Sequence, residues 1–375
     1  MILKLAFRNL VHDRIRLTVT LVGILFSIVL VAVQLGLYLG ARKMIVGMIE
    51  NAKADIWITS FGAKSFEEAG QLTGRERYGA LSTPGVDAVT PIVVSFAEWR
   101  KPAGGSTLIV LVGTDPADGG LAPWNVVDGV GSDLTTPDAV IADRTYIRDL
   151  GVSRLGDTAQ IESGKVKLAA LTSGIRSFTM APYIFTTLNR SRSLLAMPQD
   201  QATFLLVKAS DPADVPALQS RLSARLPGSD VLTKAQFIGR SLDHWLFATG
   251  AGVALIGGAI LGLIVGTVIV AQTLYSSTKD HLNEFATLRA LGSSSGYIHK
   301  VILWQAGLSA LLGYLIGMAV AMVIVHFSEQ TALPIVMTPW LAAGLLALTV
   351  FMCAISAVSA IMKVTRIDPA MVFAR

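Results

Sequence analysis

One short run of the sequence has the spacing of a catalytic serine. Gly292-Ser293-Ser294-Ser295-Gly296 matches the Gly-x-Ser-x-Gly pattern that presents a nucleophilic serine in hydrolases. That pattern needs a strand before the turn and a helix after it, because this geometry exposes the serine hydroxyl. The residues before Gly292 have the spacing of a helix instead. We therefore interpret the run as a flexible loop that ends a helix.

Other residue patterns that carry chemistry are missing from the sequence. There is no Gly-x-x-x-x-Gly-Lys-Ser/Thr loop to hold ATP and no His-Glu-x-x-His pair to hold zinc. The single cysteine, Cys353, excludes a disulfide framework and a cysteine-based metal site. We expect a non-catalytic chain that holds no metal or cofactor of its own.

The composition indicates that much of the chain is solvated by lipid. Of its 375 residues, 52% are hydrophobic and only 15% are charged, whereas soluble domains carry about 25% charged residues. The net charge of +5 would suit a nucleic-acid partner, but residues 44–244 hold 19 Lys/Arg and 21 Asp/Glu. The surplus cations lie beside the apolar runs, which is typical of membrane topology and not of phosphate binding.

Four apolar runs are long enough to cross about 30 Å of hydrocarbon. The predicted fold is an α-helical membrane protein with four transmembrane helices and a large α+β extracytoplasmic domain inserted between the first and second. The predicted order is an amphipathic cytoplasmic helix at 1–16, transmembrane helices at 17–43, 245–275, 301–327 and 340–362, the α+β domain at 44–244, a cytoplasmic loop at 276–300, a short outer loop at 328–339 and a cytoplasmic tail at 363–375.

Two alternatives concern the N-terminus. The first 16 residues equally suit a plain basic flank of the first span. A cleaved signal peptide is the competing interpretation of the first apolar run, but that run exceeds the usual apolar length of such peptides and no clear small-x-small cleavage site follows it.

The flanking cations predict the orientation of the chain. Three groups of Lys and Arg lie before the first span, between the second and third, and after the fourth, so all three fall on one side, which should be the cytoplasm. Arg42 and Lys43 are the exceptions, at the start of the large domain. We expect a multi-pass protein of the bacterial inner membrane with both termini in the cytoplasm.

The large domain shows a mixed pattern. Residues 55–59, 89–96, 107–112 and 204–208 are rich in β-branched residues and predict strands, and residues 147–150 and 215–226 predict helices. At about 200 residues the domain is large enough to bury a core of its own.

Two groups of residues near the second span invite a functional interpretation. Small residues recur at every fourth position, which lets two helix backbones approach closely in lipid; we favour self-association of two copies, with packing inside one chain as the alternative. The group is Gly258, Gly262 and Gly266. A speculative set of substrate contacts, offering adaptable apolar surface near the ends of the first two spans, is Met44, Met48, Trp245 and Phe247.

The loop between the second and third spans contains a polar, amphipathic segment, residues 278–292. Read as a helix, it places apolar side chains on one face at a spacing of three and four residues. Such a helix suits docking onto a partner protein, although a helix lying on lipid headgroups would show the same pattern. Its apolar face contains Leu282, Phe285 and Leu288, whereas Glu284 and Arg289 point elsewhere and Gly292 is placed to end the helix.

The whole chain resembles the MacB/FtsX-type permeases of ABC transporters, also called type VII. The segment Glu284-Phe285-Ala286-Thr287-Leu288-Arg289-Ala290-Leu291-Gly292 is similar to the family's coupling helix, E-I-G-x-L-R-A-I-G, with Ala286 where the family often has glycine. The tail Asp368-Pro369-Ala370 also matches. Within the external domain, residues 140–144 and 178–186 look like the DevC-type subgroup, which includes glycolipid exporters and is close to haem exporters.

The resemblance implies a mechanism without chemistry in this chain. ATP and Mg would be bound by a separate cytoplasmic ATPase, and a second copy of the chain would complete a homodimer. Closure of the ATPase would move the coupling helix, and the external domain would respond, a process called mechanotransmission. The cargo would be a lipid or another amphiphile, and a periplasmic adaptor (a membrane fusion protein) and an outer-membrane channel would receive it.

Two further functions remain open at this point. An FtsX-type regulator would use the same motion to activate a cell-wall hydrolase and transport nothing. A haem exporter is the other, with His244 as a ligand to iron, although a single histidine near a membrane surface is more often an interfacial residue.

Overall fold

The computed structural model describes residues 6–8, 11–115, 120–130, 134, 136, 138–280 and 295–365. The chain forms two compact units. A helical unit comprises residues 1–39, 253–329 and 334–375, and a mixed unit comprises residues 40–252 and 330–333. The predicted fold class, four spanning helices with a large mixed domain between the first and second, is confirmed.

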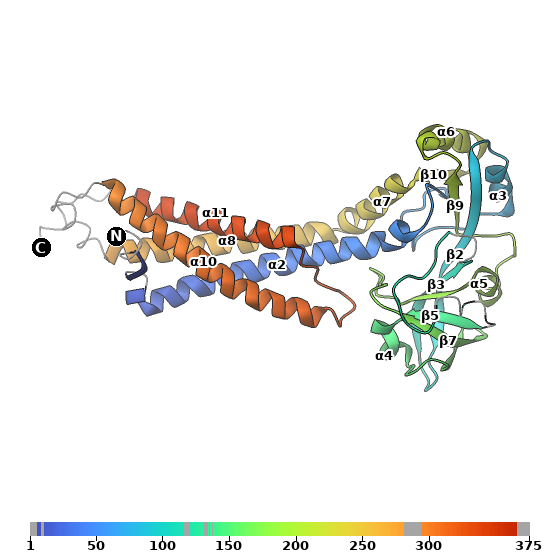
Figure 1. The fold of residues 1–375 in the computed structure, drawn as a ribbon, viewed down its shortest axis with the longest axis horizontal. Helices are drawn as coiled ribbons and strands as arrows, with labels where there is room; N and C mark the ends of the chain where they lie inside the picture. Colours follow the sequence, from blue (N-terminus) through green and yellow to red (C-terminus); the bar gives the residue numbers. More distant parts are fainter. Residues whose placement is uncertain are drawn as a thin grey trace, which may run out of the picture. The chain divides into compact units, whose positions relative to one another are not determined.

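The helical unit is built from four long helices that run side by side (Figure 1). They are α2 (Arg14–Asn51), α8 (Ala251–Asp280), α10 (Ser295–Ser328) and α11 (Pro339–Thr365). All four are long and apolar enough to cross a membrane. Pro339 begins α11 at the first helical position, where its missing N–H breaks no hydrogen bond.

Several helix ends differ from those expected from the sequence: α8 continues to Asp280 and α10 begins at Ser295, and the two differences described next affect the junction with the mixed unit. Helix α2 continues to Asn51, well past the expected end at residue 43, because Met44, Ile45, Met48 and Ile49 form a buried stripe at helical spacing. Helix α8 begins at Ala251 and not at residue 245, because Gly250, at a φ of 79°, separates it from a π-helical segment.

The mixed unit contains a ten-stranded sheet, with strand order β10-β1-β9-β2-β3-β8-β5-β7-β4 and β6 pairing with β2 and β7. Neighbouring strands are antiparallel except for β3–β8 and β5–β7. The strands are β1 (Ile56–Ser60), β2 (Val86–Arg100), β3 (Ser106–Thr114), β4 (Val126–Asp128), β5 (Ala139–Asp143), β6 (Thr158–Ile161), β7 (Gly164–Thr172), β8 (Tyr183–Thr187), β9 (Phe204–Ala209) and β10 (Ser229–Thr233).

The long strand β2 joins the two halves of this sheet. Its first part pairs with β9 and its second part pairs with β3. Short helices cover the sheet: α3 (Gly74–Leu81), α4 (Ile147–Leu150), α5 (Leu188–Leu194), α6 (Val215–Arg225) and α7 (Lys234–Leu242), followed by the π-helical segment η5 (Asp243–Ala248). The four strands and two helices expected in this domain are all present, each within a few residues of its expected ends.

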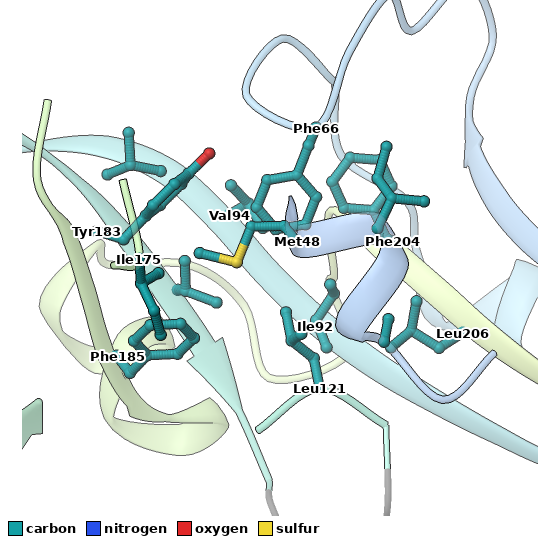
Figure 2. Packing of buried hydrophobic residues seen from close by; sticks show 14 of the residues in the cluster. Met48, Phe66, Ile92, Val94, Leu121, Ile175, Tyr183, Phe185, Phe204 and Leu206 are labelled. Atoms are coloured by element: carbon teal, nitrogen blue, oxygen red, sulfur yellow. The ribbon is translucent and has the colours of Figure 1, made fainter. Parts of the chain in front are cut away.

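Aromatic rings dominate the largest core of the mixed unit. Trp57 packs edge-on against Phe66 and Phe204, and Phe66 and Phe204 are stacked with their ring centroids 5.5 Å apart. Figure 2 shows Met48 of α2 among these rings and the apolar residues of β2, β8 and β9. The last turns of α2 are therefore part of this core.

Candidate functional site

The segment that we expect to couple to an ATPase lies outside the described residues. This applies to Leu282, Glu284, Phe285, Leu288, Arg289 and Gly292. Its described neighbours are the end of α8 at Asp280 and the start of α10 at Ser295. The coupling role of these residues therefore stays a prediction.

The small residues of α8 are in the structure and face α2 of the same chain. A Cβ added to Gly258 would lie 2.6 Å from the Gln34 side-chain nitrogen, and one added to Gly262 would lie 2.8 Å from a Leu30 methyl group. At Gly266 an added Cβ would overlap Ser27. The absence of side chains at these three positions thus lets α2 and α8 approach within van der Waals contact.

A hydrogen bond crosses the same seam between α2 and α8. The buried Ser27 hydroxyl donates to the Gly262 carbonyl oxygen at 3.0 Å. It can reach this backbone acceptor only because no side chain at Gly262 or Gly266 stands in the way.

Two glycines of α10 pack against other residues of α2 in the same way. Cβ atoms added to Gly313 and Gly317 of α10 would lie 2.5 and 3.1 Å from Ile24 and Ile28. Gly258, Gly262 and Gly266 thus pack against α2 of the same chain, which is the alternative given above, and self-association through them stays a prediction. The spacing of small residues predicts close packing but cannot say which helix is packed.

A polar cluster in the mixed unit joins three segments that are far apart in the sequence. The partly buried Glu67 carboxylate accepts hydrogen bonds from the Ser177 hydroxyl and the Tyr183 hydroxyl, both at 2.5 Å. The Ser177 hydroxyl is also 2.6 Å from that of Thr179. Ser177 and Tyr183 are buried, so Glu67 anchors the loop that leads into β8.

The neighbouring Glu68 links η5 to the loop that leads into β8. Its carboxylate lies 3.2 Å from Nε2 of His244, and the adjacent Trp245 ring meets the Phe178 ring at a centroid distance of 5.4 Å. We call this set the clasp: it consists of Glu67, Glu68, Ser177, Phe178, Tyr183, His244 and Trp245. The clasp gives His244 a structural partner within its own domain.

Burial raises the pKa of the Glu67 carboxyl, and the nearby charge of Glu68 raises that pKa further. The hydrogen bonds from Ser177 and Tyr183 oppose this shift, because they stabilise the charged form. The net effect favours the protonated form of Glu67 more than in water. Burial and the Glu67 charge likewise raise the pKa of Tyr183, which therefore remains a hydrogen-bond donor.

The four speculative substrate contacts do not share one exposed surface. Met44 and Met48 are only 5% and 1% exposed, and Met48 belongs to the aromatic core. Their side chains are inaccessible to a substrate, because the extension of α2 buries them. Trp245 is partly buried against Phe178, and Phe247 is 49% exposed.

An open hollow of about 800 Å³ lies elsewhere on the mixed unit, at the β2–β3 turn and strands β6 and β7. Arg100, Lys101 and Lys165 line it together with Glu98. Glu98 forms an ion pair with Arg100 at 3.3 Å. Within the described residues, no group of three or more His, Cys, Asp or Glu side chains is arranged to hold a metal ion.

Comparison with known families decides the class of the chain. Residues 17–225 match the family model described as MacB-like periplasmic core domain, and residues 256–369 match that of the FtsX-like permease C-terminal region.

The chain belongs to the MacB/FtsX family of ABC transporter permeases.

One relative shares the overall length of this chain and another is about twice as long. An uncharacterized ABC transporter permease of Mycobacterium bovis is 24% identical over 98% of both chains. The macrolide export ATP-binding/permease protein MacB of Agrobacterium fabrum is 24% identical over 85% of this chain, which corresponds to about half (52%) of MacB. The crystal structure of the periplasmic region of MacB from Actinobacillus actinomycetemcomitans aligns with 51% of this chain and 92% of that one, at 13% identity and a TM-score of 0.36.

Membership of the MacB/FtsX family agrees with the four spanning helices and places the chain in the inner membrane as a multi-pass protein. It also implies a cytoplasmic ATPase as a partner. The clasp and the partner helix of the glycine seam could not be found from the sequence, because both depend on contacts between residues more than 100 positions apart.

Proposed function

We propose that this chain is the permease subunit of an ABC exporter that works by mechanotransmission. A separate cytoplasmic ATPase hydrolyses ATP, the residue 278–292 segment receives the motion, and the external domain moves in response. The cargo is a lipid or another amphiphile, which passes to a periplasmic adaptor and an outer-membrane channel. Two copies of the chain form the working unit.

The observation that carries this proposal is the continuity of α2. One helix runs from Arg14 through the membrane unit to Asn51, and its last turns are packed into the core of the mixed unit. A helix is stiff along its axis, and α2 is held on two faces, by the glycines of α8 and of α10. A displacement of α8 or α10 would therefore be passed to α2 and along it.

The similarity to an ABC transporter permease that is matched over 98% of both chains supports a separate ATPase. The resemblance of residues 140–144 and 178–186 to DevC-type permeases supports a lipid cargo and an adaptor. These two segments meet in the structure, where β5 pairs with β8.

The test is a reconstituted complex of this chain with its ATPase in vesicles that contain a fluorescent lipid. We expect ATP hydrolysis to be stimulated by the permease and lipid to be exported only with both proteins present. If a pull-down of the intact complex retrieves a cell-wall hydrolase and no lipid is moved, the regulatory function replaces the exporter.

A further inference from the structure

The clasp presents an apolar surface that the fold itself does not cover. Met180 is 52% exposed at the tip of the loop that Glu67 anchors, and Phe247 is 49% exposed on η5. Phe178, two residues before Met180, and Trp245, two residues before Phe247, are in ring contact. We call these four residues the apolar lip: Phe178, Met180, Trp245 and Phe247.

The exposure of Met180 is fixed by the structure around it. Its φ of 61° is in the left-handed region, which costs a side-chain-bearing residue free energy and persists only where neighbouring contacts impose it. Those contacts are present: the Met180 N–H donates to the Ser177 carbonyl oxygen at 3.2 Å, and the Thr179 N–H donates to the Ser177 hydroxyl at 3.1 Å. Ser177 is in turn bonded to Glu67. The clasp thus holds a large apolar side chain outward.

The chain places this lip beside the membrane surface. Phe247 precedes Ala251, the first residue of a helix with the length and hydropathy of a span. Four residues extend at most about 14 Å, so Phe247 lies within reach of the headgroup layer. Tryptophan is enriched at this layer because its ring is apolar and its N–H is polar. The contact between Phe178 and Trp245 brings Met180 to the same region.

Burying the lip in the mixed unit would remove its apolar surface from water, yet the clasp keeps it exposed. A methionine beside aromatic rings suits a surface that must adapt to flexible chains, because its side chain is unbranched and polarizable. An acyl chain is a ligand of this kind, and the outer leaflet supplies it at the position that the chain dictates.

We propose that the apolar lip is a lipid-contact surface, seated in the outer leaflet, that receives the acyl chain of an amphiphile as it leaves the bilayer. The lipid contact needs only the membrane location of the chain. The role in extraction rests on the proposed export function.

The test uses single-cysteine variants of the full chain in vesicles, with Cys353→Ser as the background. An environment-sensitive fluorophore is attached at Met180→Cys and at Phe247→Cys. The matched controls are Phe61→Cys and Tyr78→Cys, because these residues are 79% and 72% exposed on other segments of the same unit. Lipids that carry a nitroxide in the upper acyl chain quench probes in the outer leaflet.

We expect quenching by the nitroxide lipid to be about threefold stronger at positions 180 and 247 than at the controls, since interfacial groups sit only about 5–10 Å into the headgroup and acyl boundary. Iodide in the outer water should quench the controls more strongly than the lip. Equal lipid quenching at all four positions would overturn the proposal. Protection of the lip probes from both quenchers would overturn it too, because a protein partner would then cover the lip.

The result does not depend on the export function, since neither ATP nor the ATPase is present. Export itself is then compared between Met180→Asp and the matched control Phe61→Asp in the complex with the ATPase. A charge at the lip should lower lipid export about tenfold, because a carboxylate disfavours contact with the acyl chain of the lipid. Strong lipid quenching together with normal export by Met180→Asp would overturn the extraction role.

Discussion

The seam between α2 and α8 predicts that alanine variants of two glycines on α8 differ widely in their free energy of unfolding. Gly266 faces Ser27, so an added Cβ would overlap the Ser27 side chain and lie 3.0 Å from Sδ of Met352. Gly257, on the same helix, has no heavy atom of another residue within 4 Å of an added Cβ. Gly266→Ala and Gly257→Ala therefore make the same chemical change in opposite surroundings.

The free-energy difference between the two variants can be worked out from these contacts. Overpacking a close contact costs about 1–3 kcal/mol. Disturbing the hydrogen bond from Ser27 to Gly262 adds about 0.6 kcal/mol, the average for such bonds in a membrane. Each variant gains about 1 kcal/mol of helix propensity, which cancels in the comparison. We expect Gly266→Ala to be about 1.6–3.6 kcal/mol less stable than Gly257→Ala.

The assay uses steric trapping in bicelles to measure the free energy of reversible unfolding of the full chain. Both variants and the wild type are compared. Gly257→Ala should be about 1 kcal/mol more stable than the wild type, because it gains helix propensity without a clash. If the two variants unfold at equal free energy, or if Gly266→Ala is the more stable, Gly266 does not pack against α2 and the seam is wrong.

Three further predictions concern the seam, the clasp and the buried Asp143 at the end of β5. In a Cys353→Ser background, Leu30→Cys with Gly262→Cys should form a disulfide within one chain, since a Cβ added at Gly262 lies 3.4 Å from the Leu30 Cβ, close to the disulfide range; a dimer band on a non-reducing gel would contradict packing inside the chain. Because burial raises the pKa of Glu67, the wild type should lose stability relative to Glu67→Gln as pH rises from about 4.5 through that raised pKa, by at most about 1.4 kcal/mol per pH unit; parallel stability curves for the two proteins would count against a buried carboxyl. Asp143→Ala should cost roughly 2–4 kcal/mol in chemical unfolding, because its buried carboxylate accepts from the N–H groups of Thr145 and Ile175 at 3.0 and 2.8 Å; a change below the error of the measurement would show that these donors find other partners.

The sequence predicts the elements of this protein well where the pattern is local. The apolar runs identify four spanning helices, and segments rich in β-branched residues identify four strands. The sequence predicts too early an end for α2, because a spanning helix is recognised in a sequence by a continuous apolar run. The buried stripe that continues the helix, from Met44 to Ile49, follows the exposed Arg42 and Lys43 and is interrupted by Gly47, so the apolar run is broken.

The candidate site depends on contacts that a single sequence does not encode visibly. Gly262 shows the spacing of a packing surface, but Leu30 and Ser27 show nothing that marks them as its partners. Glu67 and Ser177 are 110 positions apart, and each resembles an ordinary surface residue in its own segment. Only the pairing of β8 with β3 and β5 brings the Ser177 loop to Glu67 and η5.

The most direct test of the central claim measures ATP hydrolysis and lipid export together in the reconstituted complex with Glu284→Ala and Arg289→Ala combined. These two side chains are expected to form the charge-assisted bonds between permease and ATPase. The account predicts that the double variant binds membranes and folds normally but no longer exports lipid when ATP is hydrolysed. Export at the wild-type rate by the double variant would contradict it.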